Sequence, residues 1–268
     1  MTTFGTIVVS GAPGSGKTAL CAQLALAMEA SVSITPGGPE VAHDIDMLRL
    51  EQFVPDHRHL DAAALGPKIV EQSAYGPGFE GIADLHILIV DAVAARTVLK
   101  TGASLEPRTF DDIDLLVISK GDLVDHSDVA AHLRDLTAAP VVGAHHGTLP
   151  EDALPPVNRR ELRLPDNPAQ PFWSYTGAAE FSEQAADRFI VQRPAGIGRL
   201  KGRVKSGKFG LDLDVSGRAR SVTPCQSPPE TILFATGDPQ DFRESELAWH
   251  LAETASMDVS RRRMFSRR

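Results

Sequence analysis

Eight consecutive residues near the amino terminus form a pattern that is suited to binding phosphate. They read Gly-Ala-Pro-Gly-Ser-Gly-Lys-Thr, with glycines at the first and sixth places and Lys17 and Thr18 at the end. Such glycines let consecutive backbone N–H groups turn toward an anion. We expect Lys17 to reach the β- and γ-phosphates of a nucleotide and the Thr18 hydroxyl to bind Mg²⁺. The predicted phosphate-binding residues are Gly11, Ala12, Pro13, Gly14, Ser15, Gly16, Lys17 and Thr18.

The residues on either side of this loop predict the elements that hold it. Residues 6–10 are mostly β-branched, as in a buried strand, and residues 19–30 are rich in Ala, Leu and Met, as in a helix. The start of that helix adds partial positive charge where phosphate would bind. A glycine-rich turn that binds nothing is the alternative, and the complete pattern between a strand and a helix argues against it.

A second set of residues is suited to recognising guanine. Ser119, Lys120 and Asp122 follow an apolar run at 115–118 and resemble the Asn-Lys-x-Asp motif of GTPases. The Asp122 carboxylate can accept hydrogen bonds from the N1–H and the exocyclic amine of guanine, a pair of donors that adenine lacks. The stem of Lys120 can lie along the base. Ser119 has a shorter reach than asparagine, so we expect weaker affinity for the base. A helix N-terminal turn with capping acids is the alternative interpretation.

The residues after the next predicted strand are candidates for closing the base pocket. That strand lies at 141–142, and Ala144 and His145 follow it directly. We predict that both residues contact the base, and a solvated loop is an equally good interpretation of this segment.

Strand-like runs recur along the first half of the chain, with helical stretches between them. Continuous apolar strands separated by helices predict a mostly parallel sheet that is covered on both faces. We therefore predict an α/β fold of the P-loop NTPase type, with ligands bound beyond the carboxyl ends of the strands. The expected strands lie at 6–10, 31–34, 68–70, 85–90, 115–118 and 141–142.

A change of composition separates a second unit. Residues 151–171 contain several prolines among charged residues, which predicts an extended linker. Helical stretches flank short strand-like runs after it, as in a small α+β domain. We predict a nucleotide-binding domain at 1–150, a linker at 151–171, an α+β domain at 172–257 and a basic tail at 258–268.

Composition restricts the class of partner. The 268 residues carry a net charge of −8, which gives nucleic acid no general electrostatic attraction. No stretch is long and apolar enough to span a bilayer, so we expect a cytoplasmic protein without a nucleic-acid or membrane partner. Cys21 and Cys225 lie far apart and outside any Cys-x-x-Cys pattern, which argues against a disulfide framework.

The chain resembles the CobW family of P-loop GTPases and metal chaperones over most of its length. In the first unit the resemblance rests on Ile-Val-Asp-Ala at 89–92 and on Ser-Lys-Gly-Asp-Leu-Val at 119–124. In the second it rests on residues 197–202 and 234–238, which look like the start and end of that family's C-terminal domain. The resemblance implies binding of GTP and GDP, slow Mg²⁺-dependent GTP hydrolysis, and nucleotide-gated delivery of a metal or cofactor to a client protein.

The resemblance also implies roles for two further segments. Residues 40–44 are similar to the family's switch I, which places Asp44 near Mg²⁺. Residues 69–76 are similar to switch II, which places Glu71 near the same ion, and a carboxylate at a strand end suits a hard cation. The implied catalytic residues are Lys17, Thr18 and Glu71, and the implied Mg²⁺ ligands are Thr18, Asp44 and Glu71.

Two features depart from the family pattern. Ala74 stands where a glycine normally offers its N–H to the γ-phosphate, and alanine restricts the backbone there, so we expect slow hydrolysis. The family's Cys-x-Cys-Cys metal motif is absent between the two switch segments. His57 and His59 lie in that region and could bind Zn²⁺ with an aspartate, but Arg58 between them opposes a cation, and a plain surface loop is the favoured interpretation. The resemblance therefore implies a GTPase more strongly than it implies metal transfer.

Two other functions fit parts of the sequence. A nucleotide-sensing adaptor would bind GTP and a partner without turnover, in keeping with the altered switch II. An ATP-dependent small-molecule kinase would share the phosphate-binding loop, but Asp122 and the C-terminal unit argue against it. The sequence leaves open the client protein, any metal that is carried and whether the chain forms a homo-oligomer.

Overall fold

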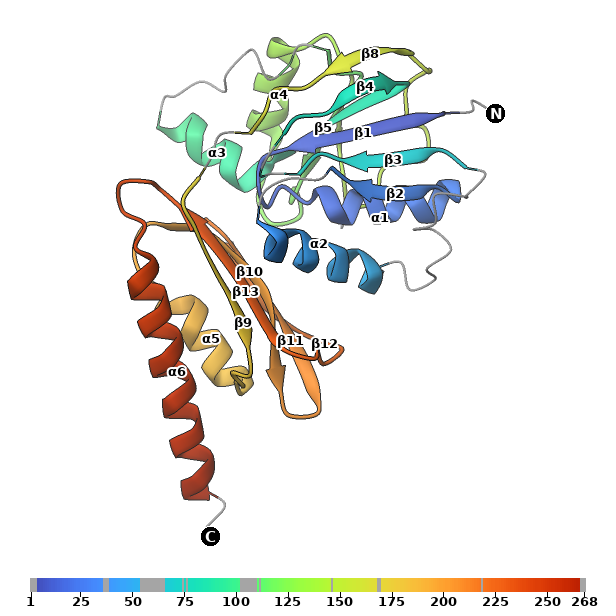
Figure 1. The fold of residues 1–268 in the computed structure, drawn as a ribbon. Coiled ribbons are helices and arrows are strands. Elements are labelled where there is room, and N and C mark those ends of the chain that lie inside the picture. Colours follow the sequence, from blue (N-terminus) through green and yellow to red (C-terminus); the bar gives the residue numbers. More distant parts are fainter. Residues whose placement is uncertain are drawn as a thin grey trace. The chain divides into compact units, whose positions relative to one another are not determined.

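A computed structural model describes residues 4–35, 39–53, 66–73, 75, 77–101, 110, 112–145, 147–167, 170–217 and 219–265 (Figure 1). The chain divides into two units. One comprises Met1–Gly38 and Asp46–Pro168, and the other comprises Pro39–Ile45 and Ala169–Arg268. Each unit has its own buried apolar core.

A six-stranded parallel sheet forms the centre of the first unit, with the strand order β2-β3-β1-β5-β6-β7. Because β1 lies between β3 and β5, the carboxyl ends of these strands lie side by side. This topology confirms the predicted α/β fold. The strands are β1 (Thr6–Gly11), β2 (Ser31–Ile34), β3 (Lys68–Glu71), β5 (Leu85–Asp91), β6 (Leu115–Ser119) and β7 (Val141–Gly143).

Helices cover both faces of this sheet because successive residues of its central strands point to opposite sides. On β5, Ile87 belongs to the core that helix α1 (Lys17–Met28) covers. Its neighbour Leu88 belongs to the core that α3 (Ala92–Lys100) and α4 (Ser127–Leu136) cover. The continuous apolar sequence of the strand is thus explained by burial on two sides.

A two-stranded antiparallel sheet also belongs to the first unit. Strand β4 (Glu80–Ala83) pairs with β8 (Arg160–Arg163), and Leu162 packs against Val8 of β1. Strand β8 therefore lies inside the stretch 151–171 that the sequence predicts as an extended linker. Leu162 is buried between exposed charged neighbours, which is the alternation of a strand with one buried face.

Helix α2 (Glu40–Phe53) occupies the region where the sequence predicts switch I. Pro39 precedes the helix, and its carbonyl oxygen accepts hydrogen bonds from the N–H groups of Ala42 and His43. Proline suits this position because the first N–H groups of a helix have no partner within it. The residues up to Ile45 group with the second unit, and those from Asp46 group with the first.

The second unit combines an antiparallel sheet with helices, as predicted for an α+β domain. Its five strands have the order β12-β11-β10-β13-β9. Helices α5 (Glu183–Val191) and α6 (Glu244–Phe265) supply Phe189 and Leu247 to its core. The strands are β9 (Phe172–Gly177), β10 (Ile197–Ser206), β11 (Phe209–Ser216), β12 (Ala219–Cys225) and β13 (Thr231–Gly237). Among the helices of the described residues, none has the length and apolar character needed to cross a membrane.

Candidate functional site

The predicted phosphate-binding loop connects the end of β1 to the start of α1. Gly14 and Gly16 have φ angles of 76° and 94°, in the left-handed region that side chains disfavour. At Gly11, where φ is 148°, an added Cβ would lie 2.5 Å from the carbonyl oxygen of Ile89. The loop therefore needs glycine both for its backbone angles and for its close approach to β5.

Lys17 lies against the loop that precedes it. Its side chain is buried, and Nζ donates hydrogen bonds to the carbonyl oxygens of Gly11 at 2.9 Å and Ala12 at 3.1 Å. A buried ammonium group requires such acceptors, because desolvation of an unpaired charge is costly. The positive charge is thus held at the start of α1, beside the backbone N–H groups of the loop.

Thr18, in the first turn of α1, meets Glu71 at the end of β3 (Lys68–Glu71). Glu71 ends β3, where it lies opposite Val9 of β1, and its side chain is only 3% exposed. Thr18 Oγ1 donates a hydrogen bond to Glu71 Oε1 at 3.1 Å. A hydroxyl oxygen and a carboxylate oxygen are hard ligands of the type that Mg²⁺ takes, and phosphate and water usually complete its coordination. The two residues therefore fit a Mg²⁺ site.

A buried thiol that is influenced by this carboxylate belongs to the core. Cys21 is fully buried on α1 and unpaired. Burial, and then the negative charge of Glu71, raise the pKa of its thiol. A thiol that stays protonated is a poor metal ligand. Across the described residues, no three or more His, Cys, Asp or Glu side chains gather as a metal-binding group.

The predicted guanine-reading segment is tied to the phosphate-binding loop. Ser119, at the end of β6, donates a hydrogen bond from Oγ to the carbonyl oxygen of Ser15 at 2.6 Å. An added Cβ at Gly16 would lie 3.8 Å from the Cβ of Ser119. The structure therefore brings the predicted phosphate-binding residues and the start of the predicted guanine-reading segment together at the carboxyl edge of the sheet.

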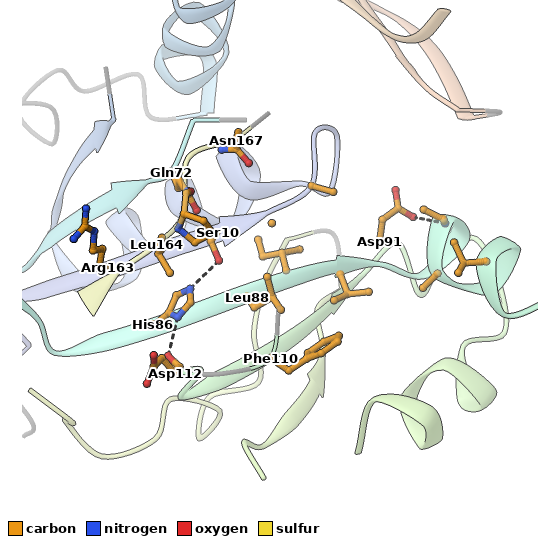
Figure 2. Close-up of a pocket in the computed structure, with 18 residues that line it drawn as sticks. Ser10, Gln72, His86, Leu88, Asp91, Phe110, Asp112, Arg163, Leu164 and Asn167 are labelled. Carbon is orange, nitrogen blue, oxygen red and sulfur yellow. Dashed lines mark hydrogen bonds between the residues drawn. The ribbon is translucent and has the colours of Figure 1, made fainter. Parts of the chain in front are cut away.

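Lys120 forms an ion pair that the sequence did not predict. Its Nζ lies 2.6 Å from Asp91 Oδ2. Asp91 ends β5 and caps α3, because its Oδ1 accepts hydrogen bonds from the N–H groups of Val93 and Ala94. Figure 2 shows the Asp91 side chain beside the start of α3. Asp91 thus orients Lys120 and was missed as a site residue, although an acidic residue at the end of a buried strand is a recognisable signal.

The remaining predicted base-binding residues lie in loops at the same edge. Asp122 is exposed, two residues beyond Lys120. Ala144 follows β7, is buried, and donates its N–H to the carbonyl oxygen of Ile118 at 2.8 Å. His145 is exposed and exchanges backbone hydrogen bonds with Thr148. The roles of these three residues toward a base stay predictions.

Several predicted residues are not brought into this arrangement. Asp44 is exposed on α2 and groups with the second unit, so its assignment to Mg²⁺ stays a prediction. Ala74, His57 and His59 lie outside the described residues.

Comparison with protein-family models gives no match, and neither does comparison with curated proteins. Solved structures that share some similarity include the Zn(II)-bound YjiA GTPase from E. coli, at 13% identity and a TM-score of 0.33, covering 95% of this chain and 99% of that chain. HypB from Helicobacter pylori in complex with nickel shares 16% identity at a TM-score of 0.35, covering 52% of this chain and 77% of its own. Scores this low support no conclusion about fold or function.

Proposed function

We propose that this chain binds a guanine nucleotide with Mg²⁺ and hydrolyses GTP slowly. The observation that carries the proposal is the meeting of three features at one edge of the sheet: the glycine loop, the contact between Thr18 and Glu71, and the tie between Ser119 and Ser15. The glycine loop suits phosphate, and the contact between Thr18 and Glu71 suits a divalent cation. The bond between Ser119 and Ser15 places the predicted base-binding segment beside them.

The side chains around the loop have separate roles in this proposal. Lys17 would exchange the carbonyl oxygens of Gly11 and Ala12 for oxygens of the β- and γ-phosphates. Thr18 and Glu71 would hold Mg²⁺, which when bound neutralises charge that develops on the transferred phosphoryl group. Water would attack the γ-phosphorus, and the bond to the bridging oxygen would break to give GDP and inorganic phosphate. Catalysis would come mainly from charge and position.

Selectivity for guanine is proposed to rest on Asp122. Its carboxylate can accept from both N–H donors of guanine, whereas adenine would leave it unpaired. Lys120, held by Asp91, would lie along the base. The resemblance to the CobW family extends the proposal to nucleotide-gated delivery of a metal or cofactor to a client protein.

Phosphate release tests the proposal directly. The full chain is incubated with GTP or ATP in the presence of Mg²⁺, and inorganic phosphate is measured over time, with Lys17→Ala as the inactive control. We expect phosphate to be released faster from GTP than from ATP, and not to be released by the Lys17→Ala variant. GTP binding without release would instead support the adaptor, and transfer from ATP to a small acceptor would support the kinase.

A further inference from the structure

A pocket of about 720 Å³ lies in the first unit, on the sheet face that α3 covers (Figure 2). Its floor includes Ser10 of β1 and His86 and Leu88 of β5, and α3 and the segment after β8 form walls. Lys17, Thr18 and Glu71 do not line it, so it is distinct from the proposed Mg²⁺ site. A volume of this size accommodates a small organic molecule.

The floor of the pocket carries a buried pair of polar side chains. His86 Nε2 lies 2.8 Å from Ser10 Oγ, and His86 Nδ1 lies 2.8 Å from the carbonyl oxygen of Asp112. The exposed fractions of Ser10 and His86 are 5% and 2%. Burial lowers the pKa of His86, so its ring is neutral near pH 7.

This pair has one consistent arrangement of protons. The carbonyl oxygen of Asp112 can only accept, so the proton of the neutral His86 ring lies on Nδ1. Nε2 then accepts, and the Ser10 hydroxyl donates to it. Ser10 Oγ therefore keeps its lone pairs for a donor on another molecule, and Ser10 lines the pocket. Ser10 Oγ can therefore accept a hydrogen bond from a ligand in the pocket.

The other lining residues restrict the charge of a ligand. Leu88, Val98 and Phe110 supply apolar wall. Asp91 and Asp112 also line the pocket, but Asp91 is paired with Lys120 and Asp112 is exposed, so neither leaves a buried, uncompensated negative charge there. Arg163 is the lining residue of opposite charge, but it is exposed and lies opposite Glu80 in the β4–β8 pair. These surroundings favour a neutral molecule.

We propose that this pocket binds a small, neutral, mainly apolar molecule that donates one hydrogen bond to Ser10 Oγ. The site does not depend on the proposed nucleotide chemistry. However, Gly11 and Ala12 line the pocket and also begin the phosphate-binding loop, so both sites share backbone.

Two nearly isosteric probes test the proposal. The N–H of indole donates, whereas the ring oxygen of benzofuran only accepts. Both are titrated into the nucleotide-free full chain, and amide chemical shifts are followed by NMR. Indole should bind about fivefold more tightly than benzofuran, as expected for one hydrogen bond. The shift changes should centre on Ala94, Ala95 and Val98 of α3, which line the pocket.

Substitutions locate the binding. Ser10→Ala should reduce the preference for indole, because the acceptor that remains, His86 Nε2, lies 2.8 Å from the position that Ser10 Oγ occupied. Ala94 is an exposed pocket residue of α3, so Ala94→Phe should fill the pocket and abolish binding of both probes. Lys100→Phe places the same ring on an exposed position of α3 outside the pocket and should leave binding unchanged.

Thermal unfolding first establishes that each variant is folded. If Ser10→Ala does not fold, the comparison of Ala94→Phe with Lys100→Phe still shows whether the probes bind in this pocket. The ratio of indole to benzofuran affinity in the unmodified chain still shows whether the ligand donates a hydrogen bond. No indole binding, equal affinity for both probes, or binding that survives Ala94→Phe would overturn the proposal.

Discussion

Ser119 Oγ lies 2.6 Å from the carbonyl oxygen of Ser15 and donates a hydrogen bond to it. This bond connects the end of β6 to the middle of the phosphate-binding loop. The usual residue at position 119 in the GTPase motif is asparagine, which is longer. The serine makes the connection because the loop and the strand end lie close together at Gly16. The bond therefore links the phosphate half of the proposed site to the base half.

Removing this link should weaken nucleotide binding. In Ser119→Ala the loop loses one hydrogen bond, and the affinity for GDP should fall about fivefold, corresponding to ~1 kcal/mol. Titration calorimetry measures the change. Ser127→Ala, which removes an exposed serine hydroxyl from the start of α4, serves as the control and should leave GDP affinity unchanged. Equal GDP affinity in Ser119→Ala and the unmodified chain would contradict the proposed link.

The charge of Lys17 should be needed for nucleotide binding. Lys17→Ala removes the ammonium group that lies beside the loop, and the affinity for a non-hydrolysable GTP analogue should drop at least tenfold, about 1.4 kcal/mol. Calorimetry is again the measurement, and Lys100→Ala on the surface of α3 is the control. An unchanged affinity in Lys17→Ala would remove the phosphate-binding role of the loop.

Glu71 should matter when Mg²⁺ is present. Glu71→Gln keeps an oxygen that can accept from Thr18 but removes the negative charge that a divalent cation requires. The gain in GDP affinity that Mg²⁺ produces should therefore shrink in this variant, while the affinity in excess EDTA should change little. Titrations with and without Mg²⁺ give both quantities. The same gain in the variant and the unmodified chain would place the cation elsewhere.

Asp122 should decide which base is bound. In Asp122→Asn the new amide donor opposes the exocyclic amine of guanine but suits the carbonyl group of xanthine. Xanthosine triphosphate should then compete better than GTP for the site, as measured by displacement of a fluorescent nucleotide. Unmodified protein that prefers ATP to GTP would contradict guanine recognition before the variant is tested.

His86 should make the stability depend on pH. Burial lowers the pKa of His86, whereas in the unfolded chain the ring titrates near its usual value of about 6.5. Below that pH the unfolded state binds the proton more readily, so the free energy of unfolding should decrease as the pH falls from about 7.5 to 5.5. Urea unfolding of the unmodified chain and of His86→Gln measures this. The difference in the free energy of unfolding between the unmodified chain and His86→Gln should become smaller as the pH falls. A difference that stays constant would show that the pKa of His86 is the same in the folded and unfolded chain.

The parallel sheet could be predicted from the sequence because burial on two faces leaves a continuous apolar signal. The six runs chosen as strands correspond to β1, β2, β3, β5, β6 and β7. The glycine loop could be recognised for a similar reason, since its backbone angles at Gly14 and Gly16 admit few other residues. Local requirements of this kind are visible in a single segment of chain.

Features that depend on distant residues were not visible in the sequence. Strand β8 has only Leu162 to mark its buried face, and the prolines around it indicate an extended spacer. The pair of Lys120 and Asp91 joins the ends of two strands that meet only when the sheet forms. The bond from Ser10 to His86 likewise joins residues on β1 and β5, and nothing in either segment specifies the partner.

The position of β8 has a consequence for synthesis on the ribosome. Val8 lies near the amino terminus, yet Leu162, which packs against it, is made only after all six strands of the parallel sheet. Chains emerge amino terminus first. The face of the sheet around Val8 is therefore covered only in part, by Ala83 of β4, until β8 is made. The proline-rich stretch that looks like a spacer completes the first unit when Leu162 arrives.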